Sequence, residues 1–220
     1  MKFVVTTGPT REHLDPVRFL SNPSTGKMGF AVARAAAMRG HEVALVAGPV
    51  SLKTPKGVRR IDVTSAREML AAVKRELSQQ APGTVFVSTA AVADWRPAKC
   101  ASRKLKKGQM SDTLKLVRNP DILKTVAHRA KHQAPARAST IFVGFAAETN
   151  DVIAEARRKC REKNLDMIVA NDVTEKGSGF GVDTNRVTFV RKDGSVERLP
   201  LMTKLAVARR IVRECEDLRP

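Results

Sequence analysis

Aromatic residues are scarce in this sequence: tyrosine is absent, one tryptophan is present, and aromatics make up 4% of the 220 residues. Proteins that bind single-stranded nucleic acid stack the bases on aromatic side chains. The net charge of +18, from 40 Lys and Arg against 22 Asp and Glu, still raises the expectation of a polyanionic partner. Because the basic residues are spread along the chain without interleaved aromatics, nucleic acid is not the expected partner, and a basic non-catalytic nucleic-acid-binding module is kept as the alternative function.

Cysteine is also sparse, and long apolar runs are missing. Cys100, Cys160 and Cys215 stand apart, without CxxC pairs or histidines at metal spacing. The spacing therefore suggests neither a zinc site nor a disulfide framework, and it fits a reducing compartment. No apolar run approaches the roughly 18 residues that a membrane helix needs. The chain also enters a strand directly from Met1, without a secretory leader. We therefore expect a cytoplasmic protein with no membrane partner and no metal ion held by its own side chains.

Standard nucleotide-binding motifs are absent as well. A Walker loop needs Gly where this chain has Ser21 and a hydroxyl residue where it has Met28. Of the dinucleotide fingerprint GxGxxG, only Gly26 and Gly29 remain. A nicotinamide-dependent enzyme also places an acidic residue at the end of its second strand, where this chain has Ala47-Gly48-Pro49. These absences make a nicotinamide enzyme a distant third reading.

Buried-strand patterns alternate with helical patterns along most of the chain. Such a rhythm produces a parallel sheet with helices on both faces, and a turn at Asp193-Gly194 adds a hairpin near the end. The predicted fold is α/β: a doubly wound, Rossmann-like, mostly parallel sheet with an antiparallel C-terminal hairpin, in a single domain over residues 1–220. The predicted strands lie at 2–7, 42–47, 57–63, 84–89, 140–149, 166–170, 186–191 and 195–199, and the helices at 29–39, 66–78, 151–163 and 203–218, with a further helix opening at 119.

Residues 21–29, which we call the anion loop, have the composition of a helix N-terminus that holds an anion. Asn22 or Ser24 is a candidate N-cap, Pro23 lies just inside the helix, and Gly26 and Gly29 allow close approach of a ligand. The first-turn amides have no partners within a helix, so they are free to point at a bound anion. An ordinary capped helix without a ligand fits the same spacing equally well.

Polar groups follow several predicted strands at their carboxyl ends, where open α/β sheets bind ligands. Charged residues at 10–18 follow the first strand. Asp94 follows small residues that begin at Ala90 and is placed to accept hydrogen bonds from ribose hydroxyls; packing of the alanines under a helix is an equal alternative. An excursion at about 95–118 carries a run of cations at 99–107. That run either stays solvated or closes over phosphates as a lid.

Two further predicted helices carry residues that could contact a ligand at the carboxyl edge of the sheet. Asn119 is predicted to cap a helix, with Pro120 at its first position and Asp121 in its first turn. Lys159 and Lys163 are four residues apart and share one face of the next helix. Both lysines are either directed at a triphosphate or solvated.

Taken together, eight motifs in order resemble the phosphopantothenate-cysteine ligase family, the synthetase half of the bacterial flavoprotein of coenzyme A biosynthesis. The match covers nearly the whole chain. The motifs are GPTRE at 8–12, DPVRF at 15–19, NPSTGKMG at 22–29, AAVADWRP at 90–97, KLKK at 104–107, NPDIL at 119–123, VGFAAET at 143–149, and KNLD at 163–166 with ANDV at 170–173.

The resemblance implies a ligation in two steps. The carboxylate of phosphopantothenate attacks the α-phosphate of a nucleoside triphosphate, which releases pyrophosphate and forms an acyl-nucleotide. The amine of L-cysteine then displaces the nucleotide and forms the amide. In the bacterial branch the nucleotide is CTP, used with Mg²⁺ or Mn²⁺. Such chemistry depends on positioning and charge neutralisation, which is consistent with the absence of a Ser-His-Asp or paired-carboxylate arrangement.

The resemblance also assigns roles to residues. Asn22 matches the asparagine that handles the acyl intermediate, and Lys104 matches the first lysine of the lid, which acts on the phosphates and in the second step; both are the expected catalytic residues. The expected nucleotide-binding residues are Ser24, Thr25, Gly26, Ser88, Thr89, Ala90, Asp94, Lys104, Pro120, Asp121, Ile122, Leu123, Phe145, Lys159 and Lys163.

The excursion at 95–118 matches the family's small dimerisation flap, so a homodimer is implied. The chain departs from the family in two places. Thr25 stands where a second serine is more usual, which keeps the hydroxyl. The chain also begins at the first strand of the ligase, so we expect either a separate ligase chain beside a flavin-dependent decarboxylase or an excised domain.

Overall fold

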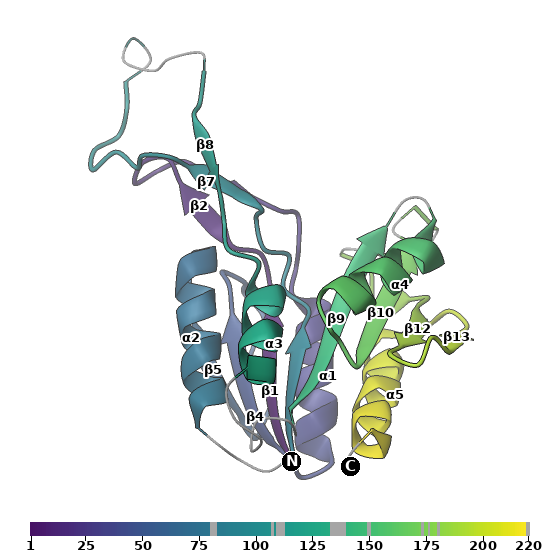
Figure 1. Cartoon of the computed structure of the whole chain (residues 1–220). Helices are drawn as coiled ribbons and strands as arrows, with labels where there is room; N and C mark the ends of the chain where they lie inside the picture. The colour runs from purple at the N-terminus through teal and green to yellow at the C-terminus, as the bar shows by residue number, and fades with distance from the viewer. Residues whose placement is uncertain are drawn as a thin grey trace.

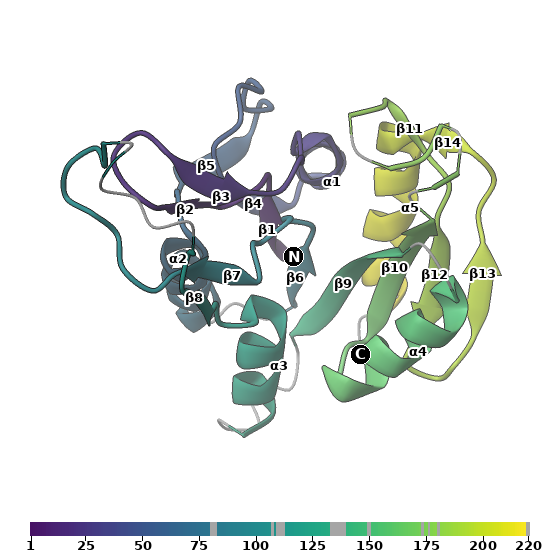
Figure 2. The ribbon, with the colours of Figure 1, turned by 90° about the horizontal axis from the view of Figure 1, so that it is seen from above.

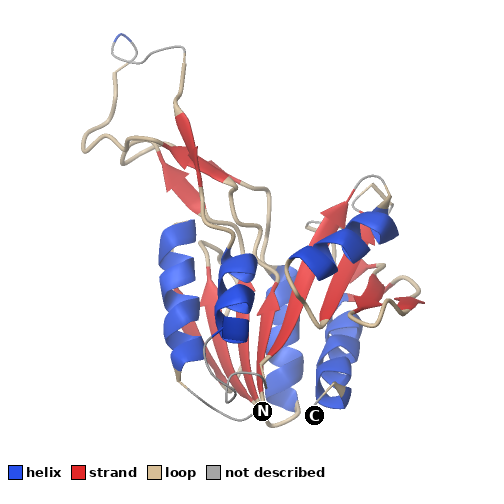
Figure 3. Ribbon diagram, viewed as in Figure 1, coloured by secondary structure: helices blue, strands red, loops and turns tan. Residues whose placement is uncertain are grey.

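In the computed structural model, helices cover both faces of one large sheet (Figures 1 and 3). The structure describes residues 1–79, 83–106, 108, 113–132, 140–148, 151–172, 174–175, 177–179 and 181–218. Three residues of the motifs, Lys107, Thr149 and Val173, lie outside these ranges. The helices are α1 (Lys27–Met38), α2 (Ala66–Ser78), α3 (Ile122–His132), α4 (Val152–Glu162) and α5 (Lys204–Asp217).

The main sheet has eight strands in the order β13-β12-β10-β9-β6-β1-β4-β5. Six are parallel, and β12 and β13 add an antiparallel hairpin at one edge. Its strands are β1 (Lys2–Thr7), β4 (Glu42–Ala47), β5 (Val58–Asp62), β6 (Thr84–Ser88), β9 (Ile141–Glu148), β10 (Met167–Asp172), β12 (Thr188–Arg191) and β13 (Val196–Arg198). The predicted doubly wound fold with its C-terminal hairpin is confirmed.

The direction of winding reverses between two neighbouring strands. From β1 the chain proceeds outward through β4 to β5, and it then returns to the other side of β1 and continues through β6, β9 and β10. Open α/β sheets bind ligands at the carboxyl ends of their strands beside such a switch point. The order of strands therefore marks the carboxyl ends of β1 and β6 as the place to look for a site.

Each face of the sheet has its own apolar core, because alternate side chains of the strands point to opposite faces. Phe3 and Val5 of β1 pack with α1 and α5, whereas Val4 packs with α2, α3 and α4. Figure 2 shows α1 and α5 on one side of the sheet and the other three helices on the opposite side. Both cores are continuous along the parallel strands, which explains the unbroken apolar runs in the sequence.

Most predicted element boundaries are correct to within a few residues, and the capping signals are partly correct. Ser65 caps α2 and accepts from Glu68 N at 3.3 Å, which is a capping signal that the sequence carries as a serine followed by a glutamate three residues later. The prediction that Asn119 caps α3 is wrong, because the helix begins at Ile122 and Lys124 N donates to Asp121 Oδ1 at 2.9 Å. Asn119 instead donates from Nδ2 to Ala93 O at 2.8 Å.

Two ribbons project beyond the carboxyl edge of the sheet (Figure 1). One pairs β2 (Arg11–His13) with β3 (Phe19–Ser21), and the other pairs β7 (Trp95–Pro97) with β8 (Leu116–Arg118). The sequence predicts only a polar connection at 10–20, so the first ribbon is an addition. We call the two ribbons and the described residues between β7 and β8 the flap, and the rest of the molecule the body. A last pair, β11 (Thr184–Asn185) with β14 (Met202–Thr203), lies beside the start of α5.

The flap is tied at its base by a buried carboxylate. Asp15 accepts from Arg18 Nε at 3.0 Å and from Leu105 N at 3.2 Å, and Arg18 Nη2 donates to Leu105 O at 2.8 Å. The hydrogen bonds from Arg18 hold the pKa of Asp15 well below its usual value. These bonds join chain segments that are about ninety positions apart in sequence.

Within the described ranges, no helix is both long enough and apolar enough to cross a bilayer.

Candidate functional site

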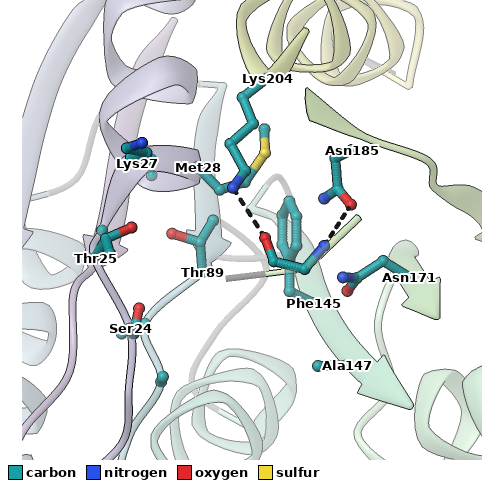
Figure 4. A pocket seen from close by; sticks show the side chains of 15 residues that line it. Ser24, Thr25, Lys27, Met28, Thr89, Phe145, Ala147, Asn171, Asn185 and Lys204 are labelled. Carbon is teal, nitrogen blue, oxygen red and sulfur yellow. Dashed lines mark hydrogen bonds between the residues drawn. The ribbon is translucent and has the colours of Figure 1, made fainter. Parts of the chain in front are cut away.

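A pocket lies at the carboxyl edge of the sheet beside the switch point (Figure 4). The start of α1 forms one side, the segment after β6 forms the floor, and β9, β10 and the chain before α5 form the other side. The lining residues are Ser24, Thr25, Gly26, Lys27, Met28, Gly29, Thr89, Ala90, Ala91, Phe145, Ala147, Asn171, Gly179, Asn185 and Lys204.

The anion loop enters α1 through a backbone cap. Gly26 has φ +77° and no side chain caps the helix, so the predicted capping by Asn22 or Ser24 and the placement of Pro23 inside the helix are wrong. Phe30 N makes the first helical hydrogen bond, to Gly26 O at 3.1 Å. Among the described residues, the N–H groups of residues 27–29 have no acceptor, and these residues line the pocket. Amides at the positive end of a helix dipole bind anions.

Glycine is required at position 29 because the helix lies directly against the sheet. A Cβ there would lie 2.4 Å from both Thr7 Oγ1 and Thr89 Oγ1, which is closer than any real contact. Thr7 Oγ1 donates to Gly26 O at 2.8 Å, and Thr89 Oγ1 donates to Thr6 O at 2.6 Å. The two hydroxyls thus hold the helix start and the floor of the pocket in a fixed relation.

The missing acidic residue at the end of β4 has a steric cause. A Cβ on Gly48 would lie 1.8 Å from Pro9 O, and Gly48 N donates to Thr7 O at 2.9 Å. The backbone after β1 therefore occupies the space in which a ribose-binding carboxylate would stand.

Asn22 joins the anion loop to the segment after β6. Its Nδ2 donates to Ala91 O at 3.2 Å and to Val92 O at 3.1 Å. Its amide N–H groups are thus used within the protein, although Asn22 itself is exposed. Next to it, Ala91 N donates to Gly8 O at 2.9 Å, so the loops after β1 and β6 run side by side.

The far side of the pocket carries an aromatic ring and a buried amide. Phe145 of β9 and Asn171 of β10 both face the pocket in Figure 4. Asn171 is 8% exposed, and within the described residues its side chain has no hydrogen-bond partner. Every fully enclosed polar side-chain atom in the same residues has a partner. The amide of Asn171 is therefore open to the pocket and available to a ligand.

The pocket closes on residues that precede and begin α5. Asn185 is buried, and its Oδ1 accepts from Ser178 Oγ at 2.6 Å. Lys27 Nζ donates to Gly181 O and to Asp183 Oδ1, both at 2.7 Å. Lys204 is buried, and burial together with the charge of Lys27 lowers its pKa.

A second group of predicted residues lies at the facing ends of α3 and α4. Lys163 Nζ is 2.8 Å from Asp121 Oδ2, and Lys159 forms an ion pair with Glu148. The prediction that the two lysines share a face is confirmed, and each already has a carboxylate partner. None of these four residues lines the pocket.

The other predicted residues fall into three places. Of the predicted nucleotide-binding residues, Ser24, Thr25, Gly26, Thr89, Ala90 and Phe145 line the pocket. Pro120, Ile122 and Leu123 stand at the start of α3, where Ile122 and Leu123 are buried in the core, and Ser88 is the last residue of β6. Asp94 is exposed beside Trp95, Arg118 and Asn119 in a separate hollow. Lys104 is exposed on the flap and does not line the pocket of its own chain.

Two charges that follow β1 have structural rather than ligand contacts. Glu12 is buried, and its Oε1 accepts from Ala66 N, at the first turn of α2, at 2.9 Å. Asp15 is buried at the base of the flap. Together with Arg18, which bonds to Asp15 and Leu105 O, these two residues of 10–18 hold the fold.

No cluster of three or more histidine, cysteine or acidic side chains suited to a metal ion occurs among the described residues.

Sequence reasoning misses Asn171, Asn185, Lys204 and the side chain of Lys27 as pocket residues. Asn171 ends a predicted strand at the ligand-binding edge, so the rule that selects Asp94 applies to it too. Lys204 follows the N-cap Thr203, and a cation at that end of a helix is unfavourable. A lysine in such a place signals another partner.

The family model described as the DNA/pantothenate metabolism flavoprotein C-terminal domain matches residues 1–218. The chain belongs to this family. The membership expected from the eight motifs, in the second half of the coenzyme A biosynthesis flavoprotein, is thus confirmed.

Relatives of this flavoprotein C-terminal domain are close in sequence and structure. The coenzyme A biosynthesis bifunctional protein CoaBC of Bacillus subtilis (strain 168) is 50% identical over 216 residues, which are 98% of this chain and 51% of that protein. CoaBC of Escherichia coli (strain K12) is 46% identical over 226 residues, 100% of this chain and 53% of that protein. The chain spans about half the length of these relatives. A crystal structure of the C-terminal domain of CoaBC superposes with a TM-score of 0.80 at 41% identity, covering 99% of this chain and 94% of that one.

Proposed function

We propose that this domain is a CTP-dependent phosphopantothenate-cysteine ligase. The observation that carries the proposal is the set of free first-turn amides of α1, which open into a pocket at the switch point of the sheet. Backbone donors of this kind suit phosphate groups. Relatives named for coenzyme A biosynthesis, at 46 to 50% identity, support phosphopantothenate as the acid that is activated.

The first step forms one bond and breaks one. A carboxylate oxygen of phosphopantothenate attacks the α-phosphorus of CTP, and the bond to the β-phosphate bridging oxygen breaks, so pyrophosphate leaves. The amides of residues 27–29 hold anionic oxygen, and Phe145 and Asn171 supply an aromatic face and an amide for the nucleotide. Mg²⁺, if bound with the nucleotide, would offset charge on the phosphates. Lys159 and Lys163, each of which forms an ion pair with a carboxylate, are also proposed to contact the nucleotide.

In the second step, the amine of cysteine attacks the acyl carbon, CMP leaves, and the amine loses a proton. Asn22 is proposed to donate to the acyl carbonyl oxygen as charge develops on it. Because its Nδ2 already donates to Ala91 O and Val92 O, binding of that oxygen exchanges one of these bonds. The neighbouring alanines, which have small side chains, leave room for the acyl group beside the backbone.

Lys104 is proposed to act across a homodimer. It lies on the flap and is absent from the pocket of its own chain. The flap also exposes large apolar side chains, among them Val17 (56%), Trp95 (44%) and Leu116 (40%). Exposed apolar surface of this kind is typical of protein interfaces. Docking of the flap on a second copy would bury this surface and bring Lys104 to the partner subunit's pocket.

The test is release of pyrophosphate from CTP and Mg²⁺ in the presence of phosphopantothenate. Without cysteine, the wild-type chain should release one pyrophosphate per site and then stop; with cysteine it should turn over. Asn22→Asp should give the burst but slow the second step, so that acyl-cytidylate accumulates. A competition between CTP and ATP tests the nucleotide. Absence of pyrophosphate release with every nucleoside triphosphate would exclude the ligase.

A further inference from the structure

Lys204 is a buried cation at the start of a helix. It is the first residue of α5 and is 7% exposed, and it lies where the helix dipole repels positive charge. Burial of a lysine is costly unless its ammonium group finds partners. Its side chain must therefore have partners, and Figure 4 marks a hydrogen bond from Lys204 to the backbone that lines the pocket.

Two of the three N–H donors of Lys204 hold the chain that forms this wall. Lys204 Nζ donates to Gly179 O at 2.9 Å and to Val182 O at 2.5 Å. Gly179 N in turn donates to Asn185 Oδ1 at 3.5 Å. The third donor of Lys204 has no partner among the described residues, although the residue lines the pocket.

The charges around this wall do not cancel. Among the described residues, Lys27 and Lys204 face one carboxylate, Asp183, which is hydrogen-bonded to Lys27 and has a side chain that is 86% exposed. Both partners of Lys204 are neutral carbonyl groups. The wall thus carries an excess positive charge next to the free amides of α1, and an anion in the pocket would neutralise it.

We propose that Lys204 is an anion-binding residue of the pocket, which fixes the wall at Gly179 and Val182 with two donors and contacts a phosphate group of the ligand with the third. The inference rests on the proposed function, because CTP is the anion concerned. Lys204 thereby adds a cation from α5 to the amides of α1. Helix α5 covers the opposite face of the sheet from α4, which carries Lys159 (Figure 2).

Calorimetric titration of the full chain with CTP and Mg²⁺, and separately with CMP, tests this role. Lys204→Met removes the charge at similar length, and Lys204→Arg keeps it. Lys2→Met is the control for loss of a buried lysine away from the pocket, since Lys2 is 3% exposed, forms an ion pair with Glu76 at 3.2 Å, and lies at the amino end of β1. Loss of a hydrogen bond to a charged group corresponds to a weakening of about tenfold or more.

We expect Lys204→Met to bind CTP about tenfold more weakly, with a smaller loss for CMP, and Lys204→Arg to bind CTP more tightly than Lys204→Met. Lys2→Met should bind as the wild type does. Equal weakening in the Met and Arg variants, or equal losses for CTP and CMP, would indicate packing and overturn the proposal.

If Lys204→Met fails to fold, Asp183→Asn provides a second test. The side chain of Asp183 is exposed, so this substitution should not prevent folding. Removing this carboxylate, which faces Lys27 and Lys204, should tighten CTP binding, and weaker binding would overturn the proposal. If the wild-type chain binds neither CTP nor ATP, the proposed function fails instead. If folded Lys204→Met binds CTP with a Kd within twofold of the wild-type value, the role of Lys204 is overturned and the proposed function is not.

Discussion

The body and the flap differ in where their polar and apolar side chains lie. In the described part of the body, every fully enclosed polar side-chain atom has a partner, and even Lys2 and Glu76 are buried as an ion pair at 3.2 Å. The flap consists of two short ribbons that expose Val17, Phe19, Trp95, Leu114 and Leu116. The body stabilises itself, whereas the flap presents a surface suited to a partner. Substitutions in the body should therefore change stability or ligand affinity, and substitutions in the flap should change turnover or assembly.

The largest expected effect is on the stability of the body. Glu76 is 3% exposed and lies between Lys2 and Arg59, at 3.2 and 2.6 Å. Glu76→Gln leaves Lys2 buried without a carboxylate and should lower the free energy of unfolding by about 3 kcal/mol. Urea unfolding measures this directly. A change below about 0.5 kcal/mol would show that the buried pair does not stabilise the body.

The same residue gives the body a pH dependence. Hydrogen bonds from Arg59, and then from Lys2, lower the pKa of Glu76 below its ordinary value of 4.5. Its contribution is thus present above that ordinary value and is lost as the pH falls below it. The stability difference between wild type and Glu76→Gln should shrink on acidification from about pH 7 to about pH 3. A constant difference would contradict this linkage.

In the flap, loss of a charge should leave stability intact and reduce turnover. Lys104→Gln should lower kcat by about a hundredfold, because it removes a cation proposed to act on the phosphates. Lys104 is exposed, so the melting temperature should not change. Arg103→Gln, a neighbouring exposed cation, is the control and should retain its kcat. Equal losses in both variants would indicate a general charge effect.

Mixing two inactive variants tests whether Lys104 acts in the partner's pocket. Random pairing of Lys104→Gln with Asn22→Asp gives heterodimers in which one of two sites has both residues intact. About a quarter of the wild-type sites should then be active. If subunits exchange and the mixture stays inactive, Lys104 acts within its own chain.

The apolar surface of the flap should control assembly. Leu116→Asp places a charge on a side chain that is 40% exposed, and Met38→Asp does the same on the body at 59% exposure. We expect Leu116→Asp to weaken dimerisation about tenfold or more, since burial of a leucine contributes about 1.5 kcal/mol or more. Met38→Asp should have no effect. Sedimentation across a concentration series measures both, and equal behaviour of the two would remove the flap from the interface.

The smallest expected effect concerns the pocket. Asn171→Ala removes a buried amide that has no partner within the described chain, so folding should be unaffected. The KM for CTP should rise about fivefold, which corresponds to one hydrogen bond of about 1 kcal/mol, while kcat stays within twofold. An unchanged KM would show that the amide does not contact the nucleotide.

The parallel sheet was predictable because its signals are local. Apolar runs such as residues 3–5 and 43–47 are typical of strands buried on both faces. The first ribbon of the flap was not predictable, because β2 and β3 have three residues each and are held by Asp15, whose partner Leu105 lies far away in sequence. Short elements fixed by distant contacts leave no periodic pattern.

The residues of the site likewise divide into those that local sequence signals predict and those that only the folded chain brings together. Gly26 was found from its place before a helix, where backbone amides bind anions. Thr89 and Phe145 were named only through the family resemblance. Lys204 and Asn185 were missed because they reach the pocket through β11, β14 and the start of α5, which come together only in the folded chain. Asn22 was predicted as a cap from its residue type, but the cap is formed by the backbone of Gly26.

The contact between Gly48 and Pro9 limits what this fold can become. A side chain at position 48 would collide with Pro9 O at 1.8 Å, and Pro9 itself is bridged to Ala91 on the pocket floor. Conversion to a nicotinamide-dependent enzyme requires a carboxylate at about this place. Directed evolution toward that activity would therefore have to rebuild the turn after β1 first, and point substitution at position 48 alone should yield chains that do not fold.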